Sequence, residues 1–217
     1  MTFEVVRRRE PAATFHAREP GEPFPRAVWV ADPTEPALVL GSAQSPEVVA
    51  PDAGIEVVRR RSGGGAVLVE PGAQLWVDVL LPATDPRWDP DVGRAFLWLG
   101  DAWVAALADL GVAARRHEGA MVTTRWSPLV CFAGLGPGEV VTPTGEKLVG
   151  ISQRRTRSGA RFQCSMPTVP WDPARILARL ALSDEERAEG ARDLTRSATH
   201  VPLDPDVVLE ALLHHLG

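Results

Sequence analysis

One lysine stands apart from every other basic residue in this chain. The sequence has 23 basic residues, and all except Lys147 are arginine, while tyrosine and asparagine are missing altogether. This composition is typical of a strong codon bias towards G and C. A lysine that survives such a bias is expected where a compact ammonium group is needed and a planar guanidinium does not fit. Lys147 is therefore the first candidate for a residue that does chemistry.

Three consecutive glycines are the second candidate. Gly63, Gly64 and Gly65 follow Arg59-Arg60-Arg61-Ser62 and join two expected strands. Glycines leave backbone N–H groups uncovered, so such a turn can cradle a phosphate or a carboxylate, and the arginines add positive charge beside it. The residue order matches neither a P-loop nor a dinucleotide-binding fingerprint. The alternative is a flexible hairpin connection with solvated arginines.

The segment around the lysine has the pattern of a strand. It runs from Gly145 to Arg154 and contains Gly150 near its middle. A glycine inside a strand indicates the close approach of a ligand or of another backbone. The alternative is a solvated lysine on an edge strand.

The cysteines and histidines give weaker signals. Cys131 and Cys164 are too few for a disulfide framework or a four-cysteine zinc site, so a reducing, cytoplasmic location is expected. The histidines share no metal-ligand spacing with each other or with the cysteines, and we expect no metal site. We expect these five to be ordinary surface or tail residues: His16, His117, His200, His214 and His215.

The order of the expected elements predicts a mixed α+β fold, with mostly antiparallel sheets packed against helices. Short strands are expected at residues 28–30, 38–40, 55–58, 66–69, 74–81, 148–154 and 161–166. Apolar periodicity and capping residues predict helices at 91–110 and 205–216, and helix starts at Asp172 and Ser183. Residues 1–26 are rich in proline and charge and have weak periodicity, although Ala12 to Arg18 could make a short helix, so order is expected to begin near Ala27. We predict an N-terminal extension of residues 1–26 and a single catalytic-type domain of residues 27–217.

Charge and hydropathy exclude two classes of partner. The net charge is -5, and the arginines at 154, 155, 157 and 161 have no aromatic residues between them, so nucleic acid is not an expected partner. An anionic ligand or an acidic protein suits these arginines better. The most apolar segment, 95–114, carries Asp101 and Asp109, which predicts a soluble helix and no membrane contact.

The glycine and lysine segments together resemble the lipoate-protein ligase and octanoyltransferase superfamily, which is related to the biotin-protein ligases. Residues 58–67 are similar to its Arg-Arg-x-Ser/Thr-Gly-Gly-Gly-Ala-Val signature, and Lys147-Leu148-Val149-Gly150 resembles its lysine motif. Leu40-Gly41-Ser42-Ala43-Gln44 is similar to the short Gly-x-x-Gln turn before the signature. The biotin-ligase sequence Gly-Arg-Gly-Arg is not matched.

The resemblance implies a biotin/lipoate-ligase-like catalytic domain that binds lipoate or octanoate and passes the acyl group to a lysine of a carrier domain. In a ligase, ATP with Mg²⁺ first makes an acyl-adenylate, and Lys147 stabilises the negative oxygens that develop. The implied carriers are the lipoyl domains of 2-oxoacid dehydrogenase E2 and the glycine cleavage H protein, or acyl carrier protein, and an accessory domain chain is a possible further partner. The implied substrate-binding residues are Gly41, Gln44, Arg60, Ser62, Gly63, Gly64, Gly65, Ala66 and Gly150.

Departures from the family pattern leave alternatives open. Val69-Glu70 stands where many relatives carry His-Asp, and Gln163-Cys164-Ser165 replaces Gln-His-Gly. A non-catalytic member that binds lipoate or an acyl carrier is therefore one alternative. The other is an ATP-independent octanoyltransferase, because one branch has a nucleophilic cysteine in a Cys-Phe pair before its lysine, as Cys131-Phe132 stands here.

Overall fold

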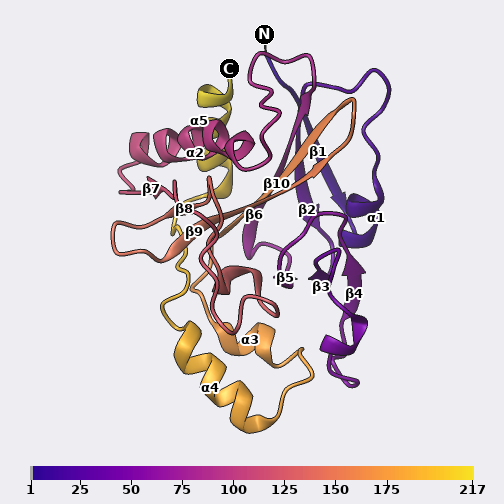
Figure 1. The fold of residues 1–217 in the computed structure, drawn as a ribbon, viewed down its shortest axis with the longest axis vertical. Helices are drawn as coiled ribbons and strands as arrows, with labels where there is room; N and C mark the ends of the chain where they lie inside the picture. The colour runs from indigo at the N-terminus through magenta and orange to yellow at the C-terminus, as the bar shows by residue number, and fades with distance from the viewer. Residues whose placement is uncertain (1) are drawn as a thin grey trace.

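A seven-stranded sheet forms the centre of the fold (Figure 1). The computed structural model describes residues 2–217. The strand order is β1-β2-β6-β10-β9-β8-β7, and every neighbouring pair is antiparallel except β1 and β2, which are parallel. The strands are β1 (Glu4–Glu10), β2 (Ala27–Pro33), β6 (Gln74–Pro82), β7 (Arg115–Arg116), β8 (Val140–Val141), β9 (Lys147–Arg155) and β10 (Gly159–Pro167). The expected α+β class with mostly antiparallel pairing is confirmed.

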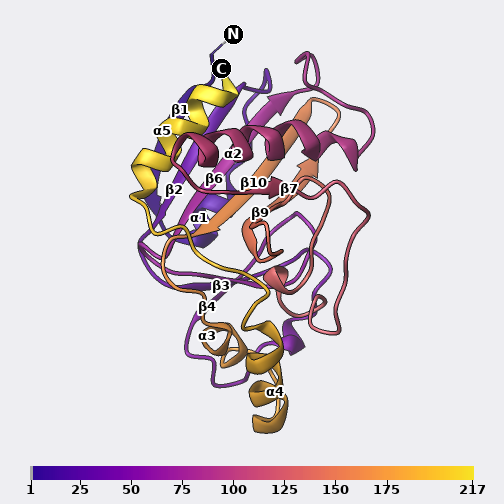
Figure 2. The same ribbon diagram turned by 90° about the vertical axis from the view of Figure 1, so that its left-hand side faces the viewer.

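Two helices cover one face of this sheet. Figure 2 shows α2 (Leu97–Asp109) and α5 (Pro205–Leu216) side by side across the strands. Their apolar faces bury Trp103 and Leu212 completely, in one core with Phe162 of β10. The expected helix start at 91 was too early, because Asp91 Oδ1 accepts hydrogen bonds from the backbone of Gly93 and Arg94. That turn leads into a 3-10 helix, η2 (Arg94–Phe96), before α2 begins.

A second, three-stranded sheet lies over the other face. Its order is β4-β3-β5, with β3 parallel to β4 and antiparallel to β5. The strands are β3 (Ala37–Leu40), β4 (Glu56–Arg59) and β5 (Val67–Val69). Val39, Val58 and Val69 from these strands share a buried cluster with Trp76 of the large sheet. The inner face of the large sheet, between the two sheets, is where the candidate site lies.

The N-terminal segment is part of this architecture. The expectation that order begins near Ala27 was wrong, because β1 extends the large sheet beside β2. The helix α1 (Ala12–Ala17) then packs beneath the small sheet, with Phe15 1% exposed and its ring centroid 4.7 Å from that of Trp76. The strand β1 was hidden in the sequence, since an edge strand exposes most of its side chains.

Two further helices lie at the far end of the molecule from the chain termini (Figure 2). They are α3 (Pro173–Leu177) and α4 (Asp184–Leu194). Asp172 caps α3 by accepting a hydrogen bond from the backbone of Ala174, and Ser183 forms a capping box with Glu186 at the start of α4. Both predicted helix starts are confirmed. No helix within residues 2–217 is long and apolar enough to cross a membrane.

Candidate functional site

Arg60 folds the glycine turn into shape. Its Nη2 donates hydrogen bonds to the carbonyl oxygens of Gly63 at 2.7 Å and Gly65 at 2.9 Å, and the residue is 4% exposed. Gly64 has a φ of +98°, in the left-handed region that favours glycine. Arg60 therefore builds the turn, and most of its donors are engaged there.

Gly41 and Gln44 support the turn from below. A Cβ on Gly41 would lie 1.9 Å from the carbonyl oxygen of Gly64, so only glycine fits at that position. Gln44 Oε1 accepts from the Gly41 backbone at 2.9 Å, and its Nε2 donates to the carbonyl of Pro128 at 2.8 Å. Both residues thus pack against the glycine turn and hold it in place.

The segment that carries Cys131 is bonded to the same turn. Ala66 N donates to the Leu129 carbonyl at 2.8 Å, and Cys131 N donates to the Ala66 carbonyl at 2.9 Å. A Cβ on Gly65 would lie 2.6 Å from the carbonyl carbon of Val130, so a glycine is required for this approach. The structure therefore brings Cys131 beside the three glycines.

Lys147 is buried in a compact set of contacts. Its Nζ lies 2.8 Å from Glu139 Oε2, donates to the Cys131 carbonyl at 3.0 Å, and is 5.3 Å from the centroid of the Phe132 ring. The Lys147 and Glu139 side chains are only 3% and 6% exposed. Sequence reasoning missed Glu139. The signal for it was the lysine itself, because a buried ammonium group needs a carboxylate partner.

Glu139 is itself held in place by the backbone. Its Oε1 accepts from the Ile151 N–H at 3.0 Å, and its Oε2 accepts from the Gly136 N–H at 2.6 Å. These bonds fix the carboxylate beside the first half of β9, next to Gly150. The Lys147 ammonium is therefore positioned by a partner that cannot easily move away.

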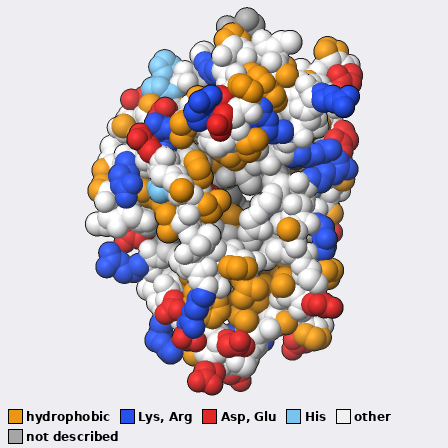
Figure 3. All heavy atoms as spheres, in the orientation of Figure 1, with side chains coloured by type: hydrophobic (Ala, Val, Ile, Leu, Met, Phe, Trp, Pro, Cys, Tyr) orange, Lys and Arg blue, Asp and Glu red, His pale blue; other side chains and the backbone are white. Residues whose placement is uncertain are grey.

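A central pocket lies between the two sheets. Its apolar lining is Val39, Val67, Val69, Trp76, Phe132 and Ile151. Three predicted site residues, Arg60, Cys131 and Gly150, also line it. Figure 3 shows one face of the molecule hollowed near its centre, with apolar side chains gathered below the hollow. Lys147 instead lines a neighbouring cavity, and Phe132 borders both spaces.

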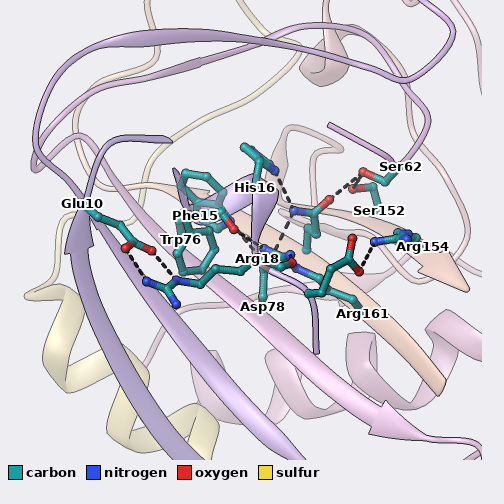
Figure 4. Close-up of polar contacts among 12 residues, drawn as sticks. Glu10, Phe15, His16, Arg18, Ser62, Trp76, Asp78, Ser152, Arg154 and Arg161 are labelled. Carbon is teal, nitrogen blue, oxygen red and sulfur yellow. Dashed lines mark hydrogen bonds and ion pairs between the residues drawn. The ribbon is translucent and has the colours of Figure 1, made fainter. Parts of the chain in front are cut away.

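A buried polar network closes one end of the central pocket. Arg161 Nε lies 2.5 Å from Asp78 Oδ2, and Gln163 Nε2 donates to the same oxygen at 3.3 Å. Ser62 Oγ donates to Gln163 Oε1 at 2.8 Å and lies 2.9 Å from Ser152 Oγ. Figure 4 shows these contacts, with Arg161 also bonded to the carbonyls of Phe15 and Arg18. Burial raises the pKa of Asp78, against the lowering effect of the Arg161 charge.

This network could have been suspected from the sequence in part. Asp78 is a lone carboxylate inside the apolar run 75–81, and Arg161 is a lone charge near the start of the apolar strand β10. A charge in such a position is expected to have a buried partner. Nothing in the sequence pointed to which residues would meet.

His16 and the arginine cluster correct two expectations. His16 is not a surface residue, because α1 places it in the wall of the central pocket with 9% exposure. The arginines at 154, 155 and 161 do not form the single basic cluster expected to suit an anionic ligand or an acidic protein. Arg161 is buried, Arg155 lies 4.0 Å from the Trp88 ring centroid, and Arg154 pairs with Glu19 at 2.9 Å.

The second cysteine and the metal question are simpler. Burial raises the pKa of the Cys164 thiol, which is 1% exposed and belongs to the core that includes Trp103. A thiol in that setting is not a nucleophile at neutral pH. Within the described residues 2–217, no three His, Cys, Asp or Glu side chains converge as a metal site.

Comparisons with known proteins support the resemblance. The family described as the lipoyl protein ligase A/B catalytic domain matches residues 15–196, while a search of curated proteins found no match. A bipartite lipoate protein ligase from Thermoplasma acidophilum, solved in a study that includes its E2 lipoyl domain, is 21% identical with a TM-score of 0.74, and the match covers 100% of this chain and 82% of that one.

Two other solved structures have the same fold. A T. acidophilum protein with bound lipoic acid is 19% identical with a TM-score of 0.69, covering 100% of this chain and 85% of that one. Lipoate-protein ligase A bound with ATP is 19% identical with a TM-score of 0.70, covering 100% and 84%. Because the family match spans most of the sequence, this chain belongs to the lipoyl protein ligase A/B catalytic-domain family.

Proposed function

We propose that this chain is a lipoate-protein ligase. It joins lipoate to a lysine of a carrier domain, with ATP as the second substrate and an acyl-adenylate as the intermediate. Support comes from the three-glycine signature at 63–65 and from the similar fold of the ATP-bound and lipoate-bound proteins.

The convergence at residues 130–132 is the observation that carries the proposal. This short segment is bonded to Ala66 after the glycine turn, accepts a hydrogen bond from Lys147, and lines the apolar central pocket. An acyl chain in that pocket would have its carboxyl end close to both the turn and the lysine. The N–H groups of the turn and the ammonium of the lysine are the groups that can stabilise negative charge during acyl transfer.

Two negative charges develop during the reaction. In the first step a carboxylate oxygen of the acid attacks the α-phosphorus of ATP, and pyrophosphate leaves. In the second step the amine of the carrier lysine attacks the acyl carbonyl carbon, loses a proton, and AMP leaves. We assign Lys147 to stabilising the oxygens that become negative, since a fixed ammonium group in a water-poor site does so effectively. The N–H groups of the glycine turn are assigned to the same oxygens.

Partners and cofactors follow from this proposal. The proposed carriers are lipoyl domains of the E2 type or the glycine cleavage H protein. An E2 lipoyl domain is also the partner named for the T. acidophilum ligase. Acyl carrier protein remains the donor only for the transferase alternative. A separate accessory domain chain is a further proposed partner. Mg²⁺ is proposed to arrive with the ATP phosphates, and no step above depends on a protein metal site.

One observation favours an octanoyltransferase as the second candidate. Cys131 is a half-buried free cysteine in the wall of the central pocket, where its thiolate could attack an acyl thioester. Such an attack forms a Cys131 thioester and releases the thiol of the acyl carrier protein. The amine of the lysine on the lipoyl domain would then attack the Cys131 thioester, take the acyl group and release the Cys131 thiol.

One experiment separates these functions. The protein is incubated with lipoate, ATP, Mg²⁺ and an apo lipoyl domain, and in parallel with octanoyl-acyl carrier protein without ATP, and both mixtures are analysed by intact mass. We expect ATP-dependent acylation of the domain that survives Cys131→Ser. A hydroxylamine-sensitive octanoyl adduct on the chain, lost in Cys131→Ser but kept in Cys164→Ala, would make it a transferase. Lipoate binding without either product would indicate a non-catalytic member.

A further inference from the structure

The proton positions in the polar network can be worked out from its hydrogen bonds. Asp78 is paired with Arg161, so its Oδ2 is an acceptor and Gln163 Nε2 must donate to it. With the amide nitrogen facing Asp78, Gln163 Oε1 faces Ser62 and accepts its hydroxyl hydrogen. The Asp78 carboxylate therefore sets the orientation of the Gln163 amide, and the Ser62 hydroxyl is compatible with it.

This orientation fixes the tautomer of His16. Gln163 Nε2 lies 3.2 Å from His16 Nδ1, and as a donor it requires Nδ1 to be the acceptor. A neutral imidazole with Nδ1 as acceptor carries its hydrogen on Nε2. Burial, with the nearby charges of Arg161 and Arg60, lowers the pKa of His16 to about 3, which keeps the ring neutral.

The N–H of His16 has no partner within the protein. No residue of the described chain, 2–217, accepts a hydrogen bond from Nε2, although His16 is only 9% exposed and lines the central pocket. The ring is held in place by its bond to Gln163 and by Trp76, whose ring centroid is 4.7 Å away. The pocket wall thus contains a fixed, neutral donor, the His16 Nε2–H, that can bond to an acceptor on a ligand.

His16 lies in the wall of the central pocket, whereas Lys147 lies in the neighbouring cavity, which shares Phe132 with the pocket. Gly150 lines the central pocket and adjoins the partner of the lysine, since a Cβ there would lie 3.5 Å from Glu139 Oε1. Ser152 is two residues further along β9 and pairs in register with Gln163, the partner of His16. A chain whose carboxyl group meets Lys147 across Gly150 therefore extends its far end towards His16.

We propose that His16 contacts the far end of the acyl chain through its Nε2–H and makes the site select a lipoyl group over an octanoyl group. This inference rests on the proposed acyl-transfer function. The dithiolane of lipoate presents sulfur atoms that can accept a weak hydrogen bond and that pack well against Trp76. The terminal methyl of octanoate accepts nothing, so its binding leaves the buried N–H of His16 unpaired.

Calorimetric titrations with free lipoate and with octanoate test this selection. We expect wild-type protein to bind lipoate about tenfold more tightly, the effect of leaving one buried donor unpaired. His16→Leu should lose this preference, because it removes both the hydrogen bond to lipoate and the donor that octanoate leaves unpaired. His16→Gln should keep it, because the amide can accept from Gln163 and donate into the pocket. His214→Leu, at an exposed histidine on α5, is the matched control.

The outcomes separate this inference from the proposed function. Equal affinities in the wild type, or an unchanged preference in His16→Leu, would overturn the selection by His16 while leaving acyl binding in place. Binding of neither acid would overturn the proposed function as well. If His16→Leu does not fold, long-range ¹H–¹⁵N spectra of the wild type decide the matter. The Nε2–H signal of His16 should shift on addition of lipoate and should not shift similarly with octanoate.

Discussion

Lys147 has surroundings that suit an ammonium group and leave little room for a guanidinium. Three close neighbours enclose it, namely the Glu139 carboxylate, the Cys131 carbonyl and the Phe132 ring. Lys147→Arg keeps the charge but places a wider, planar group in this space. We expect carrier acylation to fall by about 100-fold or more, since the charge moves away from the reacting oxygens. The rate is measured by intact mass of the carrier.

The control for this substitution is an exposed exchange of the same two residue types. Arg8→Lys changes an exposed side chain on the edge strand β1, away from both cavities, and it should leave both stability and acylation unchanged. Near-wild-type turnover in Lys147→Arg would contradict both the interpretation of the lone lysine and its assigned role.

The middle glycine of the turn is constrained by its backbone conformation. Gly64 has a φ of +98°, and a Cβ there would lie 2.9 Å from Arg60 Nη2. Gly64→Val should therefore cost about 1–3 kcal/mol of unfolding free energy and abolish lipoate binding. Gly21→Ala is the control, because Gly21 is exposed and lies outside the site, and a Cβ there meets no atom within 4 Å. Chemical denaturation and calorimetry measure the two effects. Unchanged lipoate affinity in Gly64→Val would favour a simple connecting turn.

At the scale of elements, the sequence predicted what local patterns can encode. Strands with clear apolar runs, such as β6 and β10, and helices with caps at Asp172 and Ser183 lie where they were expected. The strands β7 and β8 were missed, because a strand of two residues shows no periodicity in the sequence. The parallel edge strand β1 was missed because its exposed side chains resemble those of a charged extension.

The candidate site was predicted in the same partial way. Gly64 and Lys147 could be proposed from the sequence because each is conspicuous in composition or spacing. Glu139 and His16 could not be proposed, since the contacts that place them beside the pocket and the lysine join distant parts of the chain. His16 meets Gln163, for example, over 147 positions. A contact of that kind depends on how α1 docks beneath the sheets, which local sequence does not encode.

The short helix α1 gives the protein a pH-dependent stability through His16. The pKa of this ring is lowered to about 3 by burial and by the charges of Arg161 and Arg60, whereas an unfolded histidine has a pKa near 6.5. Below pH 6.5 the unfolded chain takes up a proton that the folded chain refuses, so stability falls as the pH falls. Between pH 7 and pH 5 this loss should reach about 2 kcal/mol.

The comparison that isolates this effect is between variants. His16→Gln cannot take up the proton, so its unfolding free energy should vary less between pH 7 and pH 5 than that of the wild type. The exposed substitution His214→Gln should follow the wild-type curve. Parallel curves for wild type and His16→Gln, measured by urea denaturation, would show that His16 is not buried in its neutral form.

For the whole molecule, the N-terminal segment decides where the domain begins. Residues 4–17 supply an edge strand, a buried Phe15 and the pocket residue His16, so we expect the chain without residues 2–17 to lose more than an appendage. Losing the burial of Phe15 alone costs about 3–5 kcal/mol, which corresponds to a fall of about 10 °C in the unfolding temperature. A chain lacking only the exposed Thr2 is the control and should melt like the wild type.

Circular dichroism measures the unfolding temperature, and calorimetry with lipoate measures binding, which should be lost with His16 and α1. If the shortened chain melts normally and still binds lipoate, residues 1–26 are an extension and the domain begins at Ala27. If it fails in both respects, the two sheets need their first strand and helix to form the pocket, and the domain begins with β1.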